Sequence, residues 1–215
     1  MYARPTDRVD DEAEAIQFLE TAAFMHLISA SEDGLSASSV PMIVDQRTGR
    51  LIGHVARANE HWRHLDGRRA LVIAAPSDGY VSPSWYPSKH ENDGRVVPTW
   101  NYESVHVHGI ARVHHDAEWL LDVVNRLTET HEARRTDGAD RWSISDAPAD
   151  FIDQQLRAIV GVSVTMERVD AKRKLTGNRS TADRAGVRDG LARTRDVSAR
   201  LVRSMTAAAG PANSP

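Results

Sequence analysis

The chain has 215 residues, no cysteine and a formal net charge of −3. The absence of cysteine excludes a disulfide framework and a thiolate zinc site. The first residues contain no apolar run long enough for a signal peptide or a membrane span, so we expect a cytoplasmic protein without membrane contact.

In chain order, the hydrophobic pattern predicts strands in the middle of the sequence and helices towards both ends. The expected strands cover 24–29, 35–44, 50–55, 70–75, 104–113 and 160–169. The expected helices cover 9–22, 119–131, 148–158 and 181–206, the last divided near Gly190. Strands and helices do not alternate as a parallel α/β sheet requires. We therefore expect a mainly β fold with helical additions (α+β), a small barrel forming a single domain over 1–206, followed by a disordered tail, 207–215.

Positive charge gathers in the last third of the chain. Residues 171–204 hold ten Lys or Arg against three Asp, which leaves the rest of the chain acidic. This segment could contact nucleic acid or a phosphate-bearing ligand. The alternative is a solvated helical face, because several of its arginines follow roughly helical spacing.

The sequence lacks several familiar catalytic and nucleotide-binding motifs. It has no Gly-x-Gly-x-x-Gly, no Walker A loop, no Gly-x-Ser-x-Gly and no His-Glu-x-x-His. Ten histidines raise the question of a metal site, with His106 and His108 on one face of an expected strand. No carboxylate stands at a convincing ligand spacing from them, Glu103 being the closest, so we expect no metal.

Two kinds of local cluster stand out. Over 53–62 an expected strand runs into a helix that begins near Asn59 as N-cap, and Arg57 and His61 beside that helix end could cradle a phosphate. The alternative is a capped surface turn with an exposed Arg. The segments 80–87 and 97–102 are rich in Trp, Tyr and Pro, which predicts rigid aromatic loops rather than strands. Such loops suit a planar ligand, a subunit interface or plain packing.

These segments carry a family resemblance. Gly53–Trp62, Tyr80–Tyr86, Val96–Tyr102 and Lys172–Arg179, in this order and spacing, resemble the PaiB-type FMN-binding negative transcriptional regulators. The resemblance covers the chain from Met1 to about residue 205. That family is related to the pyridoxine 5'-phosphate oxidase-like flavin split barrels. The resemblance therefore implies a split β-barrel, FMN as cofactor and a homodimer with flavin at the subunit interface.

The resemblance also implies which positions contact the flavin. The first contacting strand and the strand-to-helix phosphate region are matched by Ser39, Val40, Pro41, His54, Val55, Arg57, Asn59 and His61. The region approached by the partner subunit is matched by Trp100, Asn101 and Ser104, and Lys172 and Lys174 would place positive charge near the flavin or its phosphate. The chain departs from the family pattern at Glu60, which stands where Pro is usual, at Arg173, which replaces Trp, and at Thr176-Gly177, which replace Ser-Gln.

The sequence is compatible with three functions. The first is a flavin-dependent redox protein, such as a flavin reductase or oxidase, for which the sequence offers no catalytic residue. The second is a transcriptional regulator that contacts DNA through the basic segment or through a partner protein, since no helix-turn-helix is evident. The third is a haem-handling split barrel, suggested only by the number of histidines.

Overall fold

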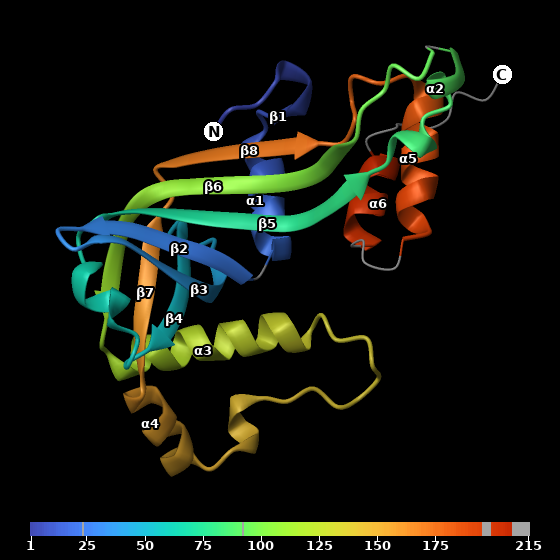
Figure 1. Cartoon of the computed structure of the whole chain (residues 1–215). Coiled ribbons are helices and arrows are strands. Elements are labelled where there is room, and N and C mark those ends of the chain that lie inside the picture. The colour runs from blue at the N-terminus through green and yellow to red at the C-terminus, as the bar shows by residue number, and fades with distance from the viewer. Residues whose placement is uncertain (23, 92, 195–198, 208–215) are drawn as a thin grey trace. The chain divides into compact units, whose positions relative to one another are not determined.

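The structure, a computed structural model, describes residues 1–22, 24–91, 93–194 and 199–207 (Figure 1). The chain forms two compact units. The barrel unit comprises Leu19–Ala74 and His106–Val169, and the terminal unit comprises Met1–Phe18, Ala75–Val105 and Asp170–Pro215. Four elements have residues in both units: α1 (Glu12–Ala22), β5 (Arg69–Val81), β6 (Thr99–His114) and β8 (Arg168–Lys174).

Antiparallel strands close on themselves in the barrel unit. They include β2 (Phe24–Ser31), β3 (Gly34–Asp45), β4 (Arg50–Ala56) and β7 (Ile159–Thr165). The order is β5-β2-β3-β4-β7-β6, and β6 returns to β5. At the start of β5, Ala111 exchanges backbone hydrogen bonds with Gly67 and Arg68. Closure of this kind leaves a barrel without free sheet edges wherever the ladders are complete.

One ladder of the barrel is incomplete. The β3–β4 pairing runs only from Asp45↔Arg50 to Met42↔Gly53, although β3 begins at Gly34 and β4 ends at Ala56. A Cβ atom on Gly53 would lie 2.6 Å from the Pro41 carbonyl oxygen, so only glycine permits this close approach. Beyond that point β4 stays paired with β7 and β3 with β2. The two strands therefore separate on the N-terminal side of Met42 in β3 and on the C-terminal side of Gly53 in β4, and we call this place the split.

Helix α3 (Ala117–Glu132) covers β4 and β7 of the barrel (Figure 1). Its apolar stripe places Val123 and Leu127 against Ile43 and Ile52. Each such side chain stabilises the fold by about 1.5–3 kcal/mol when fully buried. The same unit contains η2 (Glu60–His64), η4 (Ile144–Asp146) and α4 (Ala149–Arg157).

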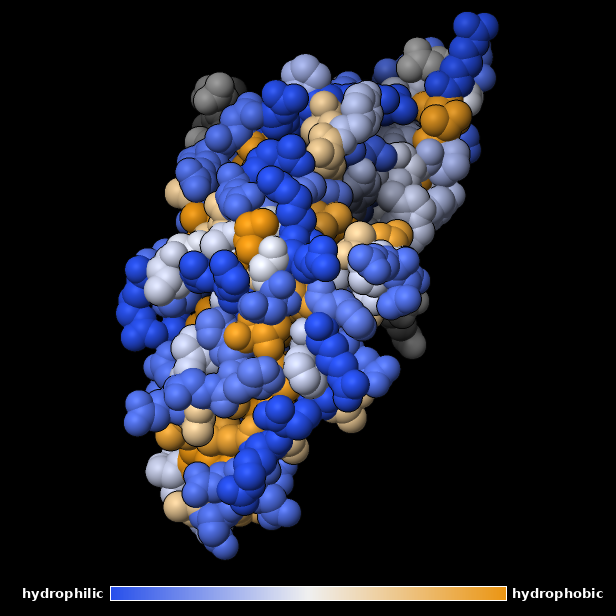
Figure 2. All heavy atoms as spheres, turned by 90° about the vertical axis from the view of Figure 1, so that its left-hand side faces the viewer, coloured by the Kyte–Doolittle hydropathy of each residue, from blue (hydrophilic) through white to orange (hydrophobic). Residues whose placement is uncertain are grey.

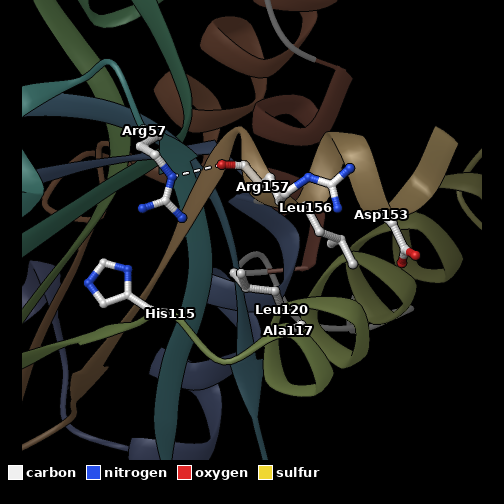
Figure 3. A pocket seen from close by; sticks show the side chains of 7 residues that line it. All are labelled: Arg57, His115, Ala117, Leu120, Asp153, Leu156 and Arg157. Atoms are coloured by element: carbon white, nitrogen blue, oxygen red, sulfur yellow. Dashed lines mark hydrogen bonds between the residues drawn. The ribbon is translucent and has the colours of Figure 1, made fainter. Parts of the chain in front are cut away.

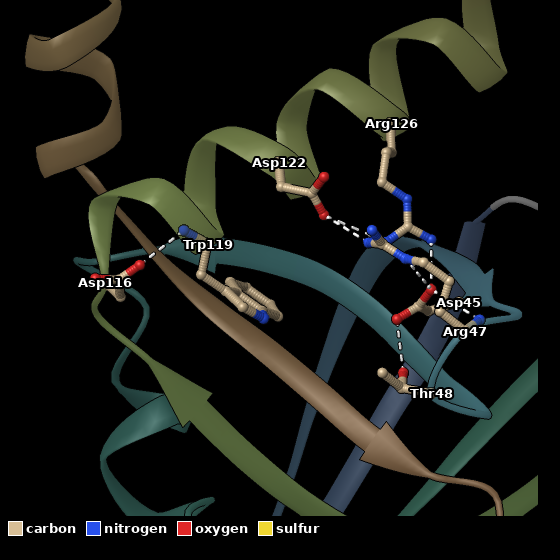
Figure 4. Close-up of polar contacts among 7 residues, drawn as sticks. All are labelled: Asp45, Arg47, Thr48, Asp116, Trp119, Asp122 and Arg126. Carbon is tan, nitrogen blue, oxygen red and sulfur yellow. Dashed lines mark hydrogen bonds and ion pairs between the residues drawn. The ribbon is translucent and has the colours of Figure 1, made fainter.

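An ion-pair network also holds α3 to the β3–β4 turn (Figure 4). The buried carboxylate of Asp45 accepts hydrogen bonds from Thr48 at 2.6 Å and from Arg126 of α3 at 2.9 Å. Arg47 lies between Asp45 and Asp122, 3.1 Å from the latter. Burial alone raises the pKa of Asp45, but the hydrogen bonds from Thr48 and Arg126 outweigh it and lower that pKa to about 2.

Both ends of the chain contribute to the terminal unit. Besides parts of the shared elements, it holds η1 (Pro5–Asp7), β1 (Arg8–Val9), η3 (Pro83–Trp85), α2 (Ser88–Glu91), α5 (Thr181–Ala192) and α6 (Ala199–Ala207). Strand β1 pairs with β8 through Arg8↔Lys172. Helices α5 and α6 pack around an apolar cluster that includes Tyr86, Leu191 and Leu201.

Three of the predicted elements were wrong. Residues 99–102 are not a loop but the start of β6. Pro98 does not prevent this, because it lies just before the strand, where no backbone N–H is needed for the ladder. The single strand expected over 160–169 is two strands, β7 and β8, separated at Met166 and Glu167. Gly190 does not divide the terminal helices: it lies inside α5, where a Cβ atom would be 2.2 Å from the Trp85 ring.

The predicted disordered tail, 207–215, lies outside the described residues apart from Ala207, the last residue of α6. A single domain over 1–206 stays a prediction. In the part of the chain that the structure describes, no helix combines the length and the apolar character needed to cross a membrane.

Candidate functional site

A buried polar cluster lies in the barrel unit near the split. His61 of η2 is 6% exposed, and both of its ring nitrogens are engaged: Nε2 lies 2.8 Å from Ser29 Oγ and Nδ1 lies 2.9 Å from Ser38 Oγ. Asn59 Nδ2 donates to the same Ser38 oxygen at 2.9 Å. We call Ser29, Ser38, Asn59 and His61 the His61 cluster.

Local sequence explains part of this arrangement. Asn59 is the N-cap of η2, and its side-chain oxygen accepts a hydrogen bond from the His61 backbone N–H, as predicted. That bond fixes the turn that carries the imidazole inward. Burial, followed by the charge of the nearby His64, lowers the pKa of His61. The imidazole is therefore neutral at pH 7, with one nitrogen donating and the other accepting.

Strand β3 brings Ser39, Val40 and Pro41 alongside the split. Because side chains alternate along a strand, Ser38 and Val40 face the interior while Ser39 faces outward, where its Oγ lies 3.0 Å from His26 Nδ1. The three residues pair with β2 on one edge. Their other edge is where β4 has separated, so a ligand could reach their backbone there.

Strand β4 carries His54 and Val55 directly after the split. Val55 is buried and opposite Val160 of β7, so its side chain belongs to the core. The Nδ1 atom of His54 is buried and has no hydrogen-bond partner in the described part of the chain. Burial lowers the pKa of this imidazole. An unsatisfied buried nitrogen of this kind is costly unless a ligand or water satisfies it.

Arg57 has a different set of contacts. Its Nε donates to the Arg157 carbonyl at 2.7 Å (Figure 3) and its Nη2 to the Ile159 carbonyl at 2.9 Å. Arg157 ends α4, so the guanidinium lies at the negative end of that helix. Arg57 therefore joins α4 and β7 to β4, and no hydrogen bond links it to the His61 cluster in the described residues.

A cavity of 330 Å³ lies beside Arg57 in the barrel unit. Figure 3 shows its walls, with Arg57 and Arg157 on one side and Ala117 and Leu120 of α3 on another. His115 and Asp153 also line it. The lining therefore combines two arginines and one carboxylate with the apolar side chains of Ala117, Leu120 and Leu156.

In the terminal unit, Trp100, Asn101 and Ser104 lie on β6. Trp100 is 52% exposed and makes an edge-to-face contact with Tyr80, their ring centres 6.1 Å apart. Asn101 is fully buried, with Nδ2 3.4 Å from Met205 Sδ and an oxygen that has no partner among the described residues. Ser104 is buried.

Both lysines of β8 are tied to neighbours within the terminal unit. Lys172 Nζ donates to the Tyr2 carbonyl at 3.3 Å and lies 5.1 Å from the ring centre of Tyr102. Lys174 Nζ donates to Thr99 Oγ1 at 2.5 Å and to the Trp100 carbonyl at 2.8 Å. The candidate residues thus fall into two groups, one in each unit.

Sequence reasoning missed a buried carboxylate in the terminal unit. Glu103 is fully buried and accepts hydrogen bonds from Ser77 at 2.7 Å, Arg200 at 2.9 Å and Arg173 at 3.2 Å. Burial raises its pKa, but the bonds from Ser77 and Ser204 and the charge of Arg200 more than compensate and lower it. Arg173 also contacts Glu103, and it is shared with Glu14 of α1. Among the described residues no group of three or more metal-binding side chains occurs.

The closed strands, the split and the buried cluster define the class of protein: this is a split β-barrel, as predicted. The family model described as "Putative FMN-binding domain" matches residues 1–168. The chain belongs to this FMN-binding domain family. The match confirms the predicted family and FMN as its cofactor.

Relatives and solved structures agree with this assignment. Protease synthase and sporulation protein PAI 2 of Bacillus subtilis is 27% identical over 186 residues, 85% of each chain. An uncharacterized protein of Saccharomyces cerevisiae is 36% identical over 110 residues, which span 49% of this chain and 64% of that protein.

Two solved structures share the fold. The flavocytochrome Anf3 of Azotobacter vinelandii has a TM-score of 0.57 at 13% identity and covers 83% of this chain and 74% of its own. A FAD and heme binding protein of Mycobacterium smegmatis has a TM-score of 0.57 at 15% identity and covers 83% of this chain and 78% of its own. At these identities the two structures establish the fold alone.

Proposed function

We propose that the chain binds FMN at the split, with the flavin phosphate held by Ser38, Asn59 and His61. The observation that carries this proposal is the His61 cluster, a buried set of hydroxyl, amide and imidazole groups where β3 and β4 separate. Buried polar groups can turn their donors to an entering phosphate with little reorganisation. The unsatisfied Nδ1 of His54 and the backbone of 39–41 supply further polar contacts nearby.

The chain's own residues then orient the cofactor and set the electrostatic environment around it. Bound FMN supplies hydride or electron transfer. His61 and Asn59 donate to phosphate oxygens, while Val55 of the same strand end packs into the core opposite β7. Arg57 adds positive charge to this end of β4 and also holds the α4–β7 junction, because its Nε and Nη2 donate to carbonyl groups.

We propose that two copies form a homodimer and that Trp100, Asn101, Ser104, Lys172 and Lys174 approach the flavin of the partner subunit. The support is exposed apolar surface: in the barrel unit Leu35 is 82% and Phe24 59% exposed, and in the terminal unit Trp100 is 52% exposed. Figure 2 shows apolar side chains lying open among hydrophilic ones on one face. Such surface favours association. Light scattering at micromolar concentration should give twice the chain mass, and a monomer would contradict the proposal.

Among the functional alternatives, the structure supports a flavin-dependent redox role better than direct DNA binding. Several arginines of the basic segment are paired with acids: Arg173 and Arg200 with Glu103, and Arg188 with Asp189. Paired arginines have less charge to offer to phosphates of DNA. A gel-shift series that finds a salt-dependent complex at low ionic strength would restore the regulator that contacts DNA directly.

The proposal is tested by titrating FMN into purified protein and following flavin fluorescence. Asn59→Asp keeps an N-cap side chain but places negative charge beside the phosphate, so we expect affinity to fall by at least tenfold, about 1.4 kcal/mol. Glu60→Gln is the control, because Glu60 is exposed and its one ion pair among the described residues is with Arg63. Equal affinity for Asn59→Asp and wild type would remove the phosphate assignment. A Soret band without flavin absorbance would favour haem instead.

A further inference from the structure

A second cavity, in the terminal unit, has the character of an anion site. Its volume is 170 Å³. It lies among η1, the start of β6 and the turn that follows β8, and its walls include Arg4, Asp7, Tyr86, Thr99, Lys174 and Arg179. Sites for drug-sized ligands usually span about 300–1,000 Å³. This cavity is suited to a smaller group.

The charges on its walls favour an anion. Three cations stand against one acid, Asp7. Neither Arg4 nor Arg179 forms an ion pair with a carboxylate in the described part of the chain. Arg179 is held in place by its guanidinium, which lies 4.8 Å from the ring centre of Tyr86. Lys174 already donates to Thr99 and to the Trp100 carbonyl, so it contributes charge, and the two guanidinium groups remain as donors.

The turn that forms one wall is strained. Thr176 is buried and has a φ of 57°, a left-handed conformation that a β-branched residue rarely adopts. The Arg179 backbone N–H closes the turn on the Thr176 carbonyl at 3.0 Å. Strain of this kind is found mainly where function requires a particular backbone shape. On the same wall, the buried Tyr86 hydroxyl has no hydrogen-bond partner of good geometry among the described residues.

We propose that this cavity binds a small oxyanion, either inorganic phosphate or the phosphate or carboxylate group of a small molecule. Arg4 and Arg179 are the direct donors, and the strained turn over 176–179 sets the place of Arg179. Asp7 disfavours multiply charged anions and can accept a hydrogen bond from a protonated oxygen of the ligand. The inference does not rest on FMN binding: apart from Lys174, none of these groups is a proposed flavin contact.

The test is calorimetric titration of inorganic phosphate into the full chain, with and without bound FMN. Arg4→Gln and Arg179→Gln should each weaken phosphate binding by about tenfold or more, the loss expected for a charged hydrogen bond. Arg95→Gln is the matched control, since Arg95 is exposed and does not line the cavity; it should leave the affinity unchanged. Asp7→Asn should tighten binding. Thermal unfolding without phosphate checks that each variant is folded.

Acetate and a phosphate monoester, titrated in the same way, distinguish the sources of the anion. Tighter binding of the monoester than of phosphate assigns the cavity to a phosphorylated small molecule, and tighter binding of acetate assigns it to a carboxylate. Phosphate that does not bind at about 10 mM, or that binds equally to both Arg variants, overturns the inference. Loss of phosphate binding on loading with FMN would also overturn it, because the cavity would then hold the flavin's own phosphate. Phosphate binding without FMN binding refutes only the proposed function.

Discussion

Asp45 provides a quantitative test of how α3 is held to the barrel. Its pKa falls from 3.8 to about 2, and its side chain is only 6% exposed. A folded-state pKa below the unfolded value means that the ionised carboxylate stabilises the fold. At about 1.4 kcal/mol per pKa unit, this contribution is roughly 2 kcal/mol at pH 7. It is fully present above pH 4 and is lost as the pH falls towards 2.

The perturbation is Asp45→Asn, which keeps the shape and an acceptor for Thr48 but removes the charge that Arg126 meets at 2.9 Å. Urea unfolding at pH 7 should show a loss of about 2 kcal/mol relative to wild type, shrinking to roughly half at pH 3. Asp122→Asn is the control: Asp122 is 48% exposed, and exposed ion pairs contribute at most about 1 kcal/mol. A loss that is the same at pH 7 and pH 3 would refute the role of the Asp45 charge.

The other predictions concern packing, charge burial and the part played by Arg57. Gly190→Ala would place a methyl group 2.2 Å from the Trp85 ring, so unfolding measurements should show a loss of about 1–3 kcal/mol, and a neutral result would contradict the packing of α5 on η3. Glu103→Gln removes the buried carboxylate that pairs with Arg200, and we expect a loss of about 3 kcal/mol or failure to accumulate in soluble form; wild-type stability would show that the buried pair is dispensable. Arg57→Gln should lower stability by about 1–2 kcal/mol through the lost carbonyl contacts, while FMN affinity changes less than in Asn59→Asp; the reverse order would make Arg57 a direct phosphate ligand.

Local patterns in the sequence were enough to predict several features of the structure. The alternation of Val105 and Val107 with His106 and His108 predicted the course of β6, and these valines are fully buried. Asn59 was recognisable as an N-cap because that signal lies within a few residues of the helix it starts. The hydrophobic pattern predicted a small barrel, and the whole-chain resemblance then added the split-barrel type and FMN as the cofactor.

Features that depend on contacts distant in sequence could not be predicted. Ser29 and Ser38 meet His61 only once the register of β2 and β3 is fixed, and neither residue type marks a site by itself. Arg57 reaches carbonyl groups about a hundred positions away, so it looked like a free cation. Glu103 becomes a buried, neutralised acid only when α6 brings Arg200 to it.

Errors at element boundaries have a similar cause. Aromatic and proline residues around 97–102 are typical of a loop, yet the ladder of β6 begins directly after Pro98. Glycine is common at helix ends, but Gly190 lies inside α5, where the absence of a side chain lets the Trp85 ring pack against the helix. In both places a tertiary neighbour decided the local structure.

Whether the His61 cluster holds the flavin phosphate is tested most directly by the FMN affinity of Asn59→Asp compared with wild type and Glu60→Gln, measured by quenching of flavin fluorescence on binding. Binding at the split through the His61 cluster predicts that wild type and Glu60→Gln bind FMN alike and that Asn59→Asp binds at least tenfold more weakly. Wild-type affinity in Asn59→Asp would place the flavin phosphate elsewhere and contradict FMN binding through the His61 cluster.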